Sequence, residues 1–322
     1  MTPSAKLTTH TSPDVSEDLE RLLQAHLPYS LPVLRRLQHA KYKDGMPPNA
    51  RAVVVSSGDV LGGDQLASAR FTAAYVDYGG GPDTQMWLFS TLEEVEKPSD
   101  ADKAEYRLQI EELVRELVRL GREYGKPTVY PGGLLLGSLH TAVRDIVLDL
   151  GRAAPRATGF YDKWLFQAKG FPEKDAPLPD GMRWDTASLD DCRIVVSRTD
   201  IPRVAYVCVD GWPVASILLT EDKNLIIRIE DGTPIAWAFL GFDGSLCSLY
   251  CEEPYRRRGL ATALGAKLMR TGCGPYATDG WATADVAASN AGSRAMCKSL
   301  NGEQHWEVSW MMLDITEDGL KD

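Results

Sequence analysis

The fold is decided by the stretch PYRRRGLATAL, Pro254 to Leu264, in which three arginines and a glycine precede an apolar-periodic segment. Leu260, Leu264 and Leu268 recur at the spacing of one helix face and predict a helix that begins beside Gly259. The first N–H groups of a helix have no partner within it and lie at the positive end of its dipole, so they favour an anion. A basic loop that enters such a helix predicts a phosphate site.

Three predicted strands lead into this loop, at residues 224–231, 234–242 and 245–253, which are rich in β-branched and aromatic residues. Asp-Gly pairs at 231–232 and 243–244 separate the strands. Because both residue types tolerate positive φ, these pairs predict tight hairpins.

The elements after the loop complete an ordered series. WATADVAASN predicts a strand that ends at Asn290, a short helix follows, and HWEVSWMML predicts a terminal strand. This order, with Arg256, Gly259 and Ala261 at the spacing (Gln/Arg)-x-x-Gly-x-(Gly/Ala), resembles the GCN5-related N-acetyltransferase (GNAT) superfamily, whose loop cradles the pyrophosphate of coenzyme A. The stretch 201–264 is similar to its glycine N-acyltransferase-like, or FR47-like, branch.

The resemblance implies an α+β fold with a mixed sheet, built as two tandem GNAT-like halves. Residues 168–191 hold three prolines, two glycines and six acidic residues, the composition of a linker. We therefore expect a degenerate N-terminal domain at 1–175, with a disordered lead over 1–15, and an acyl-CoA-binding domain at 176–322. The patterns predict helices over 16–26, 31–41, 101–125, within 134–150 and over 201–209, and strands over 51–57, 70–78, 84–90, 159–167 and 192–197.

The contacts to the co-substrate also follow from the resemblance. The implied co-substrate is acetyl-CoA or another acyl-CoA, without a metal. Its pyrophosphate is expected on the backbone N–H groups of the loop, and its pantetheine along the strand 246–252. The implied binding residues are Leu249, Tyr250, Cys251, Arg256, Arg257, Arg258, Gly259, Leu260, Ala261, Thr262, Asn290 and Ser293.

The sequence leaves the general base open. In the glycine N-acyltransferases a Glu directly after the hairpin glycine is the proposed base, and here that position is Ser245. Three carboxylates remain near the loop: Asp243, Glu252 and Asp285. They also have ordinary interpretations, as a turn residue, a solvated strand end and a surface carboxylate, respectively.

The general acid departs from the family pattern as well. The family places a Tyr seven residues after the Asn at position 290, and here that position is Cys297. A thiol has an ordinary pKa of about 8.5 and can donate a proton to a departing thiolate, but free cysteine is also among the most buried residue types. Tyr250 and Tyr255 are alternative donors.

Composition excludes several classes of protein. The formal net charge of -10 argues against a nucleic-acid partner, which would need a basic face. No apolar run approaches the length of a membrane span, and the amino terminus has neither a secretory nor a transit pattern, so we expect a cytoplasmic protein. Six cysteines without a CxxC pair suggest neither a disulfide framework nor a zinc site.

The leading hypothesis is an acyl-CoA-dependent N-acyltransferase that modifies a small amine or amino acid by direct attack in a ternary complex. Ser245 and Cys297 keep a second class open, a thioester-processing relative such as a decarboxylase or cyclase. A third possibility is a non-catalytic module that binds coenzyme A.

Overall fold

The computed structural model describes residues 7–172, 175, 177–198 and 223–316, and the chain divides into two compact units. The first is Met1–Phe160 with Glu307–Asp322, and the second is Tyr161–Trp306. Composition placed the boundary at 175/176 instead. The predicted and observed boundaries differ because a long strand, β6 (Ala153–Gln167), continues past Phe160. Its residues Tyr161–Gln167 pair with a strand of the second unit.

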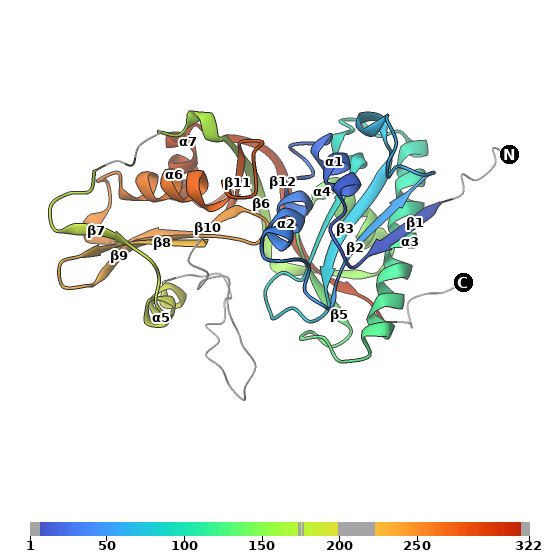
Figure 1. Ribbon diagram of the computed structural model, residues 1–322, viewed down its shortest axis with the longest axis horizontal. Helices are drawn as coiled ribbons and strands as arrows, with labels where there is room; N and C mark the ends of the chain where they lie inside the picture. Colours follow the sequence, from blue (N-terminus) through green and yellow to red (C-terminus); the bar gives the residue numbers. More distant parts are fainter. Residues whose placement is uncertain (1–6, 173–174, 176, 199–222, 317–322) are drawn as a thin grey trace. The chain divides into compact units, whose positions relative to one another are not determined.

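The strands of the first unit are ordered β1-β2-β3-β4-β5-β12, and each pairs antiparallel with its neighbour except β4 with β5, which is parallel. Figure 1 shows the arrangement. The elements are β1 (Thr8–Ser12), α1 (Glu17–Gln24), α2 (Leu31–Tyr42), β2 (Ala50–Ser56), η1 (Leu66–Ser68), β3 (Phe71–Asp77), β4 (Met86–Ser90), η2 (Thr91–Glu94), α3 (Asp100–Tyr124), β5 (Gly133–His140), α4 (Thr141–Asp149) and β12 (Glu303–Asp314).

Most predicted elements of this unit are confirmed, with one correction and one addition. The lead over 1–15 is not disordered throughout, because it contains β1, which pairs with β2 along its whole length. The helix predicted within 134–150 is confirmed as α4, but the sequence analysis missed the strand β5 before it, whose run LLLGSL is buried in the sheet before His140 caps the helix. A short apolar run does not by itself distinguish a buried strand from a buried helix.

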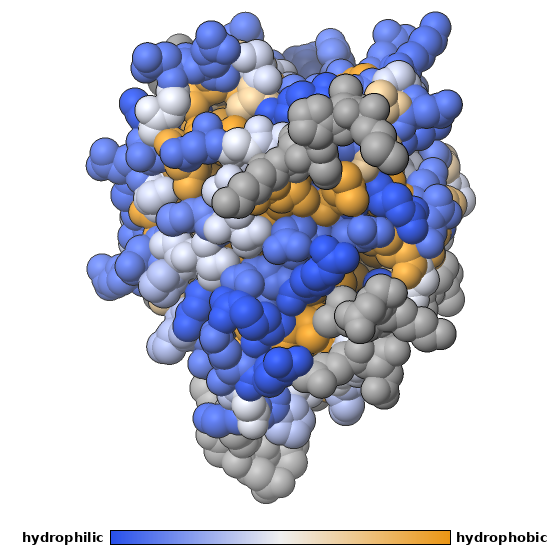
Figure 2. All heavy atoms as spheres, turned by 90° about the vertical axis from the view of Figure 1, so that its right-hand side faces the viewer, coloured by the Kyte–Doolittle hydropathy of each residue, from blue (hydrophilic) through white to orange (hydrophobic). Residues whose placement is uncertain are grey.

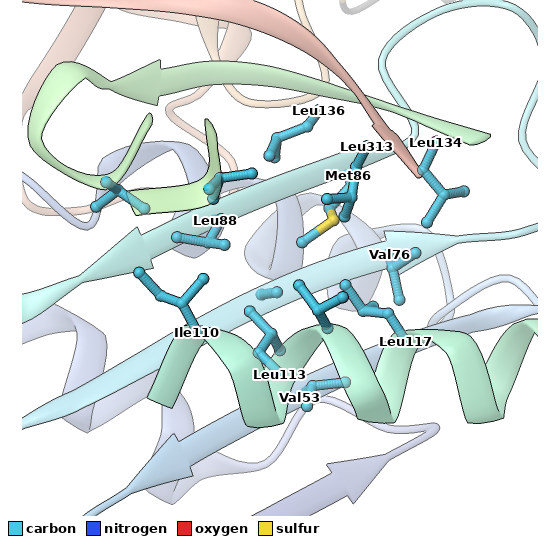
Figure 3. Packing of buried hydrophobic residues seen from close by; sticks show 14 of the residues in the cluster. Val53, Val76, Met86, Leu88, Ile110, Leu113, Leu117, Leu134, Leu136 and Leu313 are labelled. Carbon is cyan, nitrogen blue, oxygen red and sulfur yellow. The ribbon is translucent and has the colours of Figure 1, made fainter. Parts of the chain in front are cut away.

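The core of the first unit lies between α3 and the sheet. Ile110, Leu113 and Leu117 form the apolar stripe of α3 and point toward strand residues such as Val76 and Leu136, as Figure 3 shows. The opposite face of α3 carries ion pairs three and four residues apart. Hydrophilic side chains cover much of the face in Figure 2, which looks at the side where α3 and β1 lie in Figure 1.

The second unit has the strand order β6-β11-β10-β9-β8-β7. Both predicted hairpins are confirmed, with Gly232 at φ 90° and Gly244 at φ 72° in their turns. The elements after β6 are η3 (Ala168–Gly170), β7 (Met182–Asp185), α5 (Leu189–Ser197), β8 (Asn224–Ile229), β9 (Pro234–Leu240), β10 (Ser245–Cys251), η6 (Glu253–Tyr255), α6 (Leu260–Gly272), β11 (Trp281–Ala287) and α7 (Ala291–Ser299).

The predicted strand over 192–197 is wrong, because this segment is the helix α5. Ser188 and Asp191 form a reciprocal capping box at its start. Cys192 and Val195, three residues apart, then pack against Trp237 and other strand residues. The helix expected over 201–209 lies outside the described residues.

Two hydrophobic layers cover the two faces of the second sheet. In Figure 1, α6 and α7 lie on one side of β8–β10 and α5 on the other. Leu264 and Leu268 of α6 pack with Ala238 and Ala284, whereas Trp237 and Phe239 face α5. Side chains therefore alternate between the layers along each strand.

The two units repeat one order of elements, which gives the fold as two tandem GNAT-like halves in a mixed α/β arrangement. In the first, the parallel strands β4 and β5 are connected through α3, and in the second β10 and β11 are connected through α6. In both, the parallel strands share only two pairs of residues.

Candidate active site

The strands β10 and β11 part soon after they meet. They pair at Ser245 with Thr283 and at Leu246 with Ala284, and no further pair joins them among the described residues. The following residues of β10, Cys247–Tyr250, are half-buried. The two strands therefore leave a gap whose closed end lies at Leu246 and whose open end lies toward the basic loop.

A bulge in β10 borders the closed end of this gap. The pairing of β10 with β9 shifts register between Cys247 and Tyr250, and Ser248 in between has φ 51°. Positive φ is uncommon in a serine, and such outliers often occur at functional sites. The Ser248 hydroxyl is buried and has no hydrogen-bond partner among the described residues. The sequence analysis missed this residue, because nothing in SLCSLYC signals a bulge.

The basic loop presents an uncapped helix start to the open end of the gap. Gly259 is the residue before α6 and has φ 76°, and no side chain of the described residues caps this helix. A Cβ on Gly259 would meet nothing within 4 Å, so the backbone angle rather than space requires glycine here. The first turn of α6 contains no acidic residue, which leaves its N–H groups suited to an anion.

The equivalent helix of the first unit is built differently. The hydroxyl of Ser99 accepts from the backbone N–H of Asp102, and the Asp102 carboxylate accepts from the backbone N–H of Ser99. Asp102 also pairs with Arg70 at 2.7 Å. A carboxylate of the chain itself therefore caps the start of α3, whereas no side chain within the described ranges caps the start of α6.

The three arginines occupy different environments. The Nε–H of Arg256 donates to the carbonyl of Cys251 at 2.9 Å, and its guanidinium lies 5.3 Å from the centre of the Tyr250 ring. Arg258 donates to the Pro254 carbonyl at 3.1 Å. The side chain of Arg257 is exposed and forms no hydrogen bond or ion pair with any described residue, and its backbone φ is 62°. Two arginines thus stabilise the loop, and the middle one extends into solvent.

Three further predicted co-substrate contacts, Asn290, Ser293 and Thr262, also have hydrogen-bond partners within the chain. Asn290 caps α7, since its Oδ1 accepts from the backbone N–H of Ser293 at 3.0 Å. The Thr262 and Ser299 hydroxyl oxygens are 3.0 Å apart, which ties the start of α6 to α7. Leu260 is buried in the core, whereas Ala261 is half-buried. These side chains order the loop, and backbone groups remain for binding.

The candidate carboxylates lie at different places along the gap. Asp243 is buried in the turn before β10 and accepts from the backbone N–H and the hydroxyl of Ser245, at 3.1 and 2.6 Å. Glu252 lies at the opposite end of β10, where its carboxylate accepts from Arg198 at 3.0 Å. These contacts agree with the interpretation of Asp243 as a turn residue and of Glu252 as a residue at a strand end.

Asp285 is not a surface carboxylate. Its side chain is 7% exposed and forms an ion pair of 2.6 Å with Lys163, whose side chain is 2% exposed. The two residues are directly opposite each other in the antiparallel register of β11 and β6. Asp285 follows Ala284, the last residue of β11 that pairs with β10, so it borders the closed end of the gap.

Cys297 is a core residue rather than an accessible acid. It is completely buried in the hydrophobic layer between α6, α7 and the sheet. Burial raises the pKa of its thiol to about 12, because the thiolate would lose its hydration. Tyr250 and Tyr255, both half-buried near the loop, remain the accessible proton donors among the predicted residues.

Comparisons with known proteins assign the family through the first unit. Residues 4–164, half of the chain, match the family model of the acyl-CoA N-acyltransferase verG N-terminal domain. This chain belongs to the GNAT acyl-CoA N-acyltransferases. No curated protein matches it.

No group of three or more potential metal ligands occurs among the described residues, and no helix within them is long and apolar enough to cross a bilayer.

The chain is also similar to solved structures at low sequence identity. A Drosophila protein has a TM-score of 0.55 at 18% identity, over 93% of this chain and 97% of its own. A tandem GNAT protein from the clavulanic acid biosynthesis pathway has a TM-score of 0.47 at 12% identity, over 97% and 99% of the two chains. A GCN5-related N-acetyltransferase from Sphaerobacter thermophilus has a TM-score of 0.47 at 13% identity, over 96% of each.

Proposed function

We propose that the second unit transfers an acyl group from acyl-CoA to a small amine by direct attack in a ternary complex. One observation carries the proposal: the gap between β10 and β11 opens toward an uncapped helix start that follows three arginines. A linear thioester with a dianionic pyrophosphate at one end matches a gap between two strands that ends at a helix start suited to an anion.

The residues of β10 define how the co-substrate would lie. The pyrophosphate would bind the backbone N–H groups between Arg256 and Thr262, with Arg257 adding charge from solvent. From there the pantetheine would extend back along β10, whose edge toward β11 is unpaired beyond Leu246 among the described residues. The strand from Leu246 to Cys251 spans about 16 Å at roughly 3.3 Å per residue, which would bring the thioester to the closed end.

The reaction balances without an additional reagent. The nitrogen of the amine attacks the thioester carbonyl, the C–N bond forms and the C–S bond breaks, and coenzyme A leaves as the thiol. An acceptor that enters as an ammonium ion loses two protons, of which one remains on the thiol and one passes to solvent. The Ser248 hydroxyl at the bulge, which has no hydrogen-bond partner in the described part of the chain, would donate a hydrogen bond to the developing oxyanion.

A second candidate is a thioester-processing enzyme that needs no amine. It is favoured by Ser245 at the family's base position and by the burial of Cys297 at its acid position. Both enzymes would share the same binding gap.

The experiment that tests the proposal follows free thiol from acetyl-CoA with and without amines. Thiol release that requires an amine, with one equivalent of amide formed, supports acyl transfer. Release without an amine supports the second candidate. Calorimetry with coenzyme A gives an independent check. If the protein does not bind coenzyme A, both candidate functions are contradicted.

A further inference from the structure

The first unit contains a counterpart of the proposed co-substrate gap. The strands β4 and β5 share two parallel pairs of residues, and α3 follows β4 as α6 follows β10. The strands β10 and β11 of the second unit have the same arrangement. The chain thus has two places of the same topology, and their side chains decide which of them is able to bind coenzyme A.

The end of β4 is buried, unlike the end of β10. Leu88 is 4% exposed and packs in the core layer with α3, where Figure 3 shows it beside Ile110. Phe89 is fully buried, and the centre of its ring lies 5.6 Å from that of Phe71. The corresponding residues of β10, Cys247–Tyr250, are half-buried. Side chains of the first unit therefore cover the strand that the second unit leaves partly exposed.

Polar groups at the end of β4 have partners within the first unit. The hydroxyl of Ser90 accepts from the hydroxyl of Thr72 at 3.2 Å, and the backbone N–H of Ser90 donates to the Glu93 carboxylate at 3.0 Å. In β10, by contrast, the buried hydroxyl of Ser248 has no partner in the part of the chain that the structure describes. A bound pantetheine would therefore satisfy a polar group in the second unit and find the equivalent groups of Ser90 already satisfied.

The two segments that lead into the helices differ in charge. Residues 252–262 of the second unit contain three arginines and two glutamates. Residues 91–102 of the first unit contain one lysine and five acidic residues. The five are Glu93, Glu94, Glu96, Asp100 and Asp102. A dianionic pyrophosphate is therefore attracted to the segment before α6 and repelled by the segment before α3.

Asp102 places a carboxylate at the start of α3. It accepts from the hydroxyl and the backbone N–H of Ser99, at 2.7 and 2.9 Å, and from Arg70 at 2.7 Å. The Ser99 hydroxyl, the Arg70 guanidinium and the Ser99 N–H lower the pKa of Asp102 to about 2, so this group is ionised at neutral pH. Arg70 also pairs with Glu105 at 2.9 Å. The helix start and the guanidinium beside it therefore already have a negative partner.

We infer that the chain binds one coenzyme A, in the second unit, because the Asp102 carboxylate takes in the first unit the place that the pyrophosphate would take in the second. This inference rests on the proposed function. The first unit keeps the framework of a co-substrate site but holds a built-in anion at its helix start. Each chain therefore has a single catalytic gap.

The number and the location of the sites are measured on the full-length protein. Calorimetric titration with coenzyme A should give one molecule bound per chain. Hydrogen exchange at saturating coenzyme A should slow by about tenfold or more at backbone amides within 253–262, because the ligand stabilises that segment. Exchange within 91–102 should stay unchanged.

Matched substitutions at the two helix starts separate the units. Thr262→Glu adds a carboxylate to the start of α6 and should weaken coenzyme A binding by at least about 15-fold. Asp102→Asn should leave the Kd within about twofold of the wild-type value. It should lower the melting temperature by roughly 2 to 4 °C, because the helix start loses its charge and Arg70 loses an ion pair. Asp100→Asn is the control for this shift, since Asp100 is also in the first turn but is exposed and outside the capping box, and it should lower the melting temperature less.

The outcomes distinguish this inference from the proposed function. Two molecules of coenzyme A per chain would overturn the inference alone, as would slowed exchange within 91–102. A Kd that changes in Asp102→Asn and not in Thr262→Glu would place the site in the first unit and also overturn it. An unchanged melting temperature of Asp102→Asn would contradict the role of this carboxylate as the built-in anion. If the protein binds no coenzyme A, the proposed function fails and the inference fails with it.

Discussion

A single substitution in the first turn of α6 tests the phosphate site by separating stability from binding. Thr262→Glu places a carboxylate at the third position of the helix, where the dipole favours negative charge. The free protein should become slightly more stable. Its affinity for coenzyme A should fall, because the new charge occupies the region in which the pyrophosphate would bind.

The two magnitudes follow from elementary electrostatics. A favourable carboxylate in a first turn contributes about 0.3 to 1 kcal/mol to the free energy of unfolding. One negative charge about 5 Å from a dianion is repelled by about 1.7 kcal/mol in water, or roughly 15- to 20-fold in Kd. This repulsion is a lower bound, because the loop is less polarisable than bulk water.

The assay is calorimetric titration with coenzyme A at low salt, together with thermal unfolding of the free protein. Thr262→Gln is the matched control, since it has the same size and also loses the contact with the Ser299 hydroxyl. The Glu variant should bind at least about 15-fold more weakly than the Gln variant, and the difference should shrink as salt is added. Equal affinities would refute the phosphate site at this helix start.

Three further outcomes are expected. Arg257→Ala should leave the melting temperature unchanged, because its side chain has no partner among the described residues, and should weaken coenzyme A binding by about tenfold in calorimetry. Cys297→Ala should lower the free energy of unfolding by about 1 to 2 kcal/mol in denaturant titration, while kcat stays within about twofold of the wild-type value. A large loss of kcat would instead support Cys297 as the general acid. Burial lowers the pKa of His140 from 6.5 to about 4, so the unfolded chain binds a proton at higher pH than the folded chain does. The free energy of unfolding should therefore fall as the pH drops from 6.5 to 4. The variant His140→Asn can still cap α4, and it should remove on the order of 2 to 3 kcal/mol of that pH dependence in denaturant titrations.

The elements that the sequence predicted correctly depend on local chemistry. The Asp-Gly hairpins, the amphipathic α3 and the loop into α6 each have their signal within a few residues. The helix α5 was mistaken for a strand because Cys192–Ser197 is short and apolar, and only its packing against Trp237 distinguishes the two. The boundary at 175/176 differed because β6 continues past the division and β12 returns to the first unit.

The sequence by itself predicted the proposed anion site, because three arginines, a glycine and a helix start are neighbours along the chain. It also determined the order of strands and helices that identifies the superfamily. Only the tertiary structure decided which carboxylate borders the gap and which serine forms the bulge. Asp285 and Lys163 are far apart in sequence and meet through strand register. Ser248 lies where the register of β10 against β9 shifts, so its conformation depends on that pairing. Register is a property of the assembled sheet, so no local pattern encodes it.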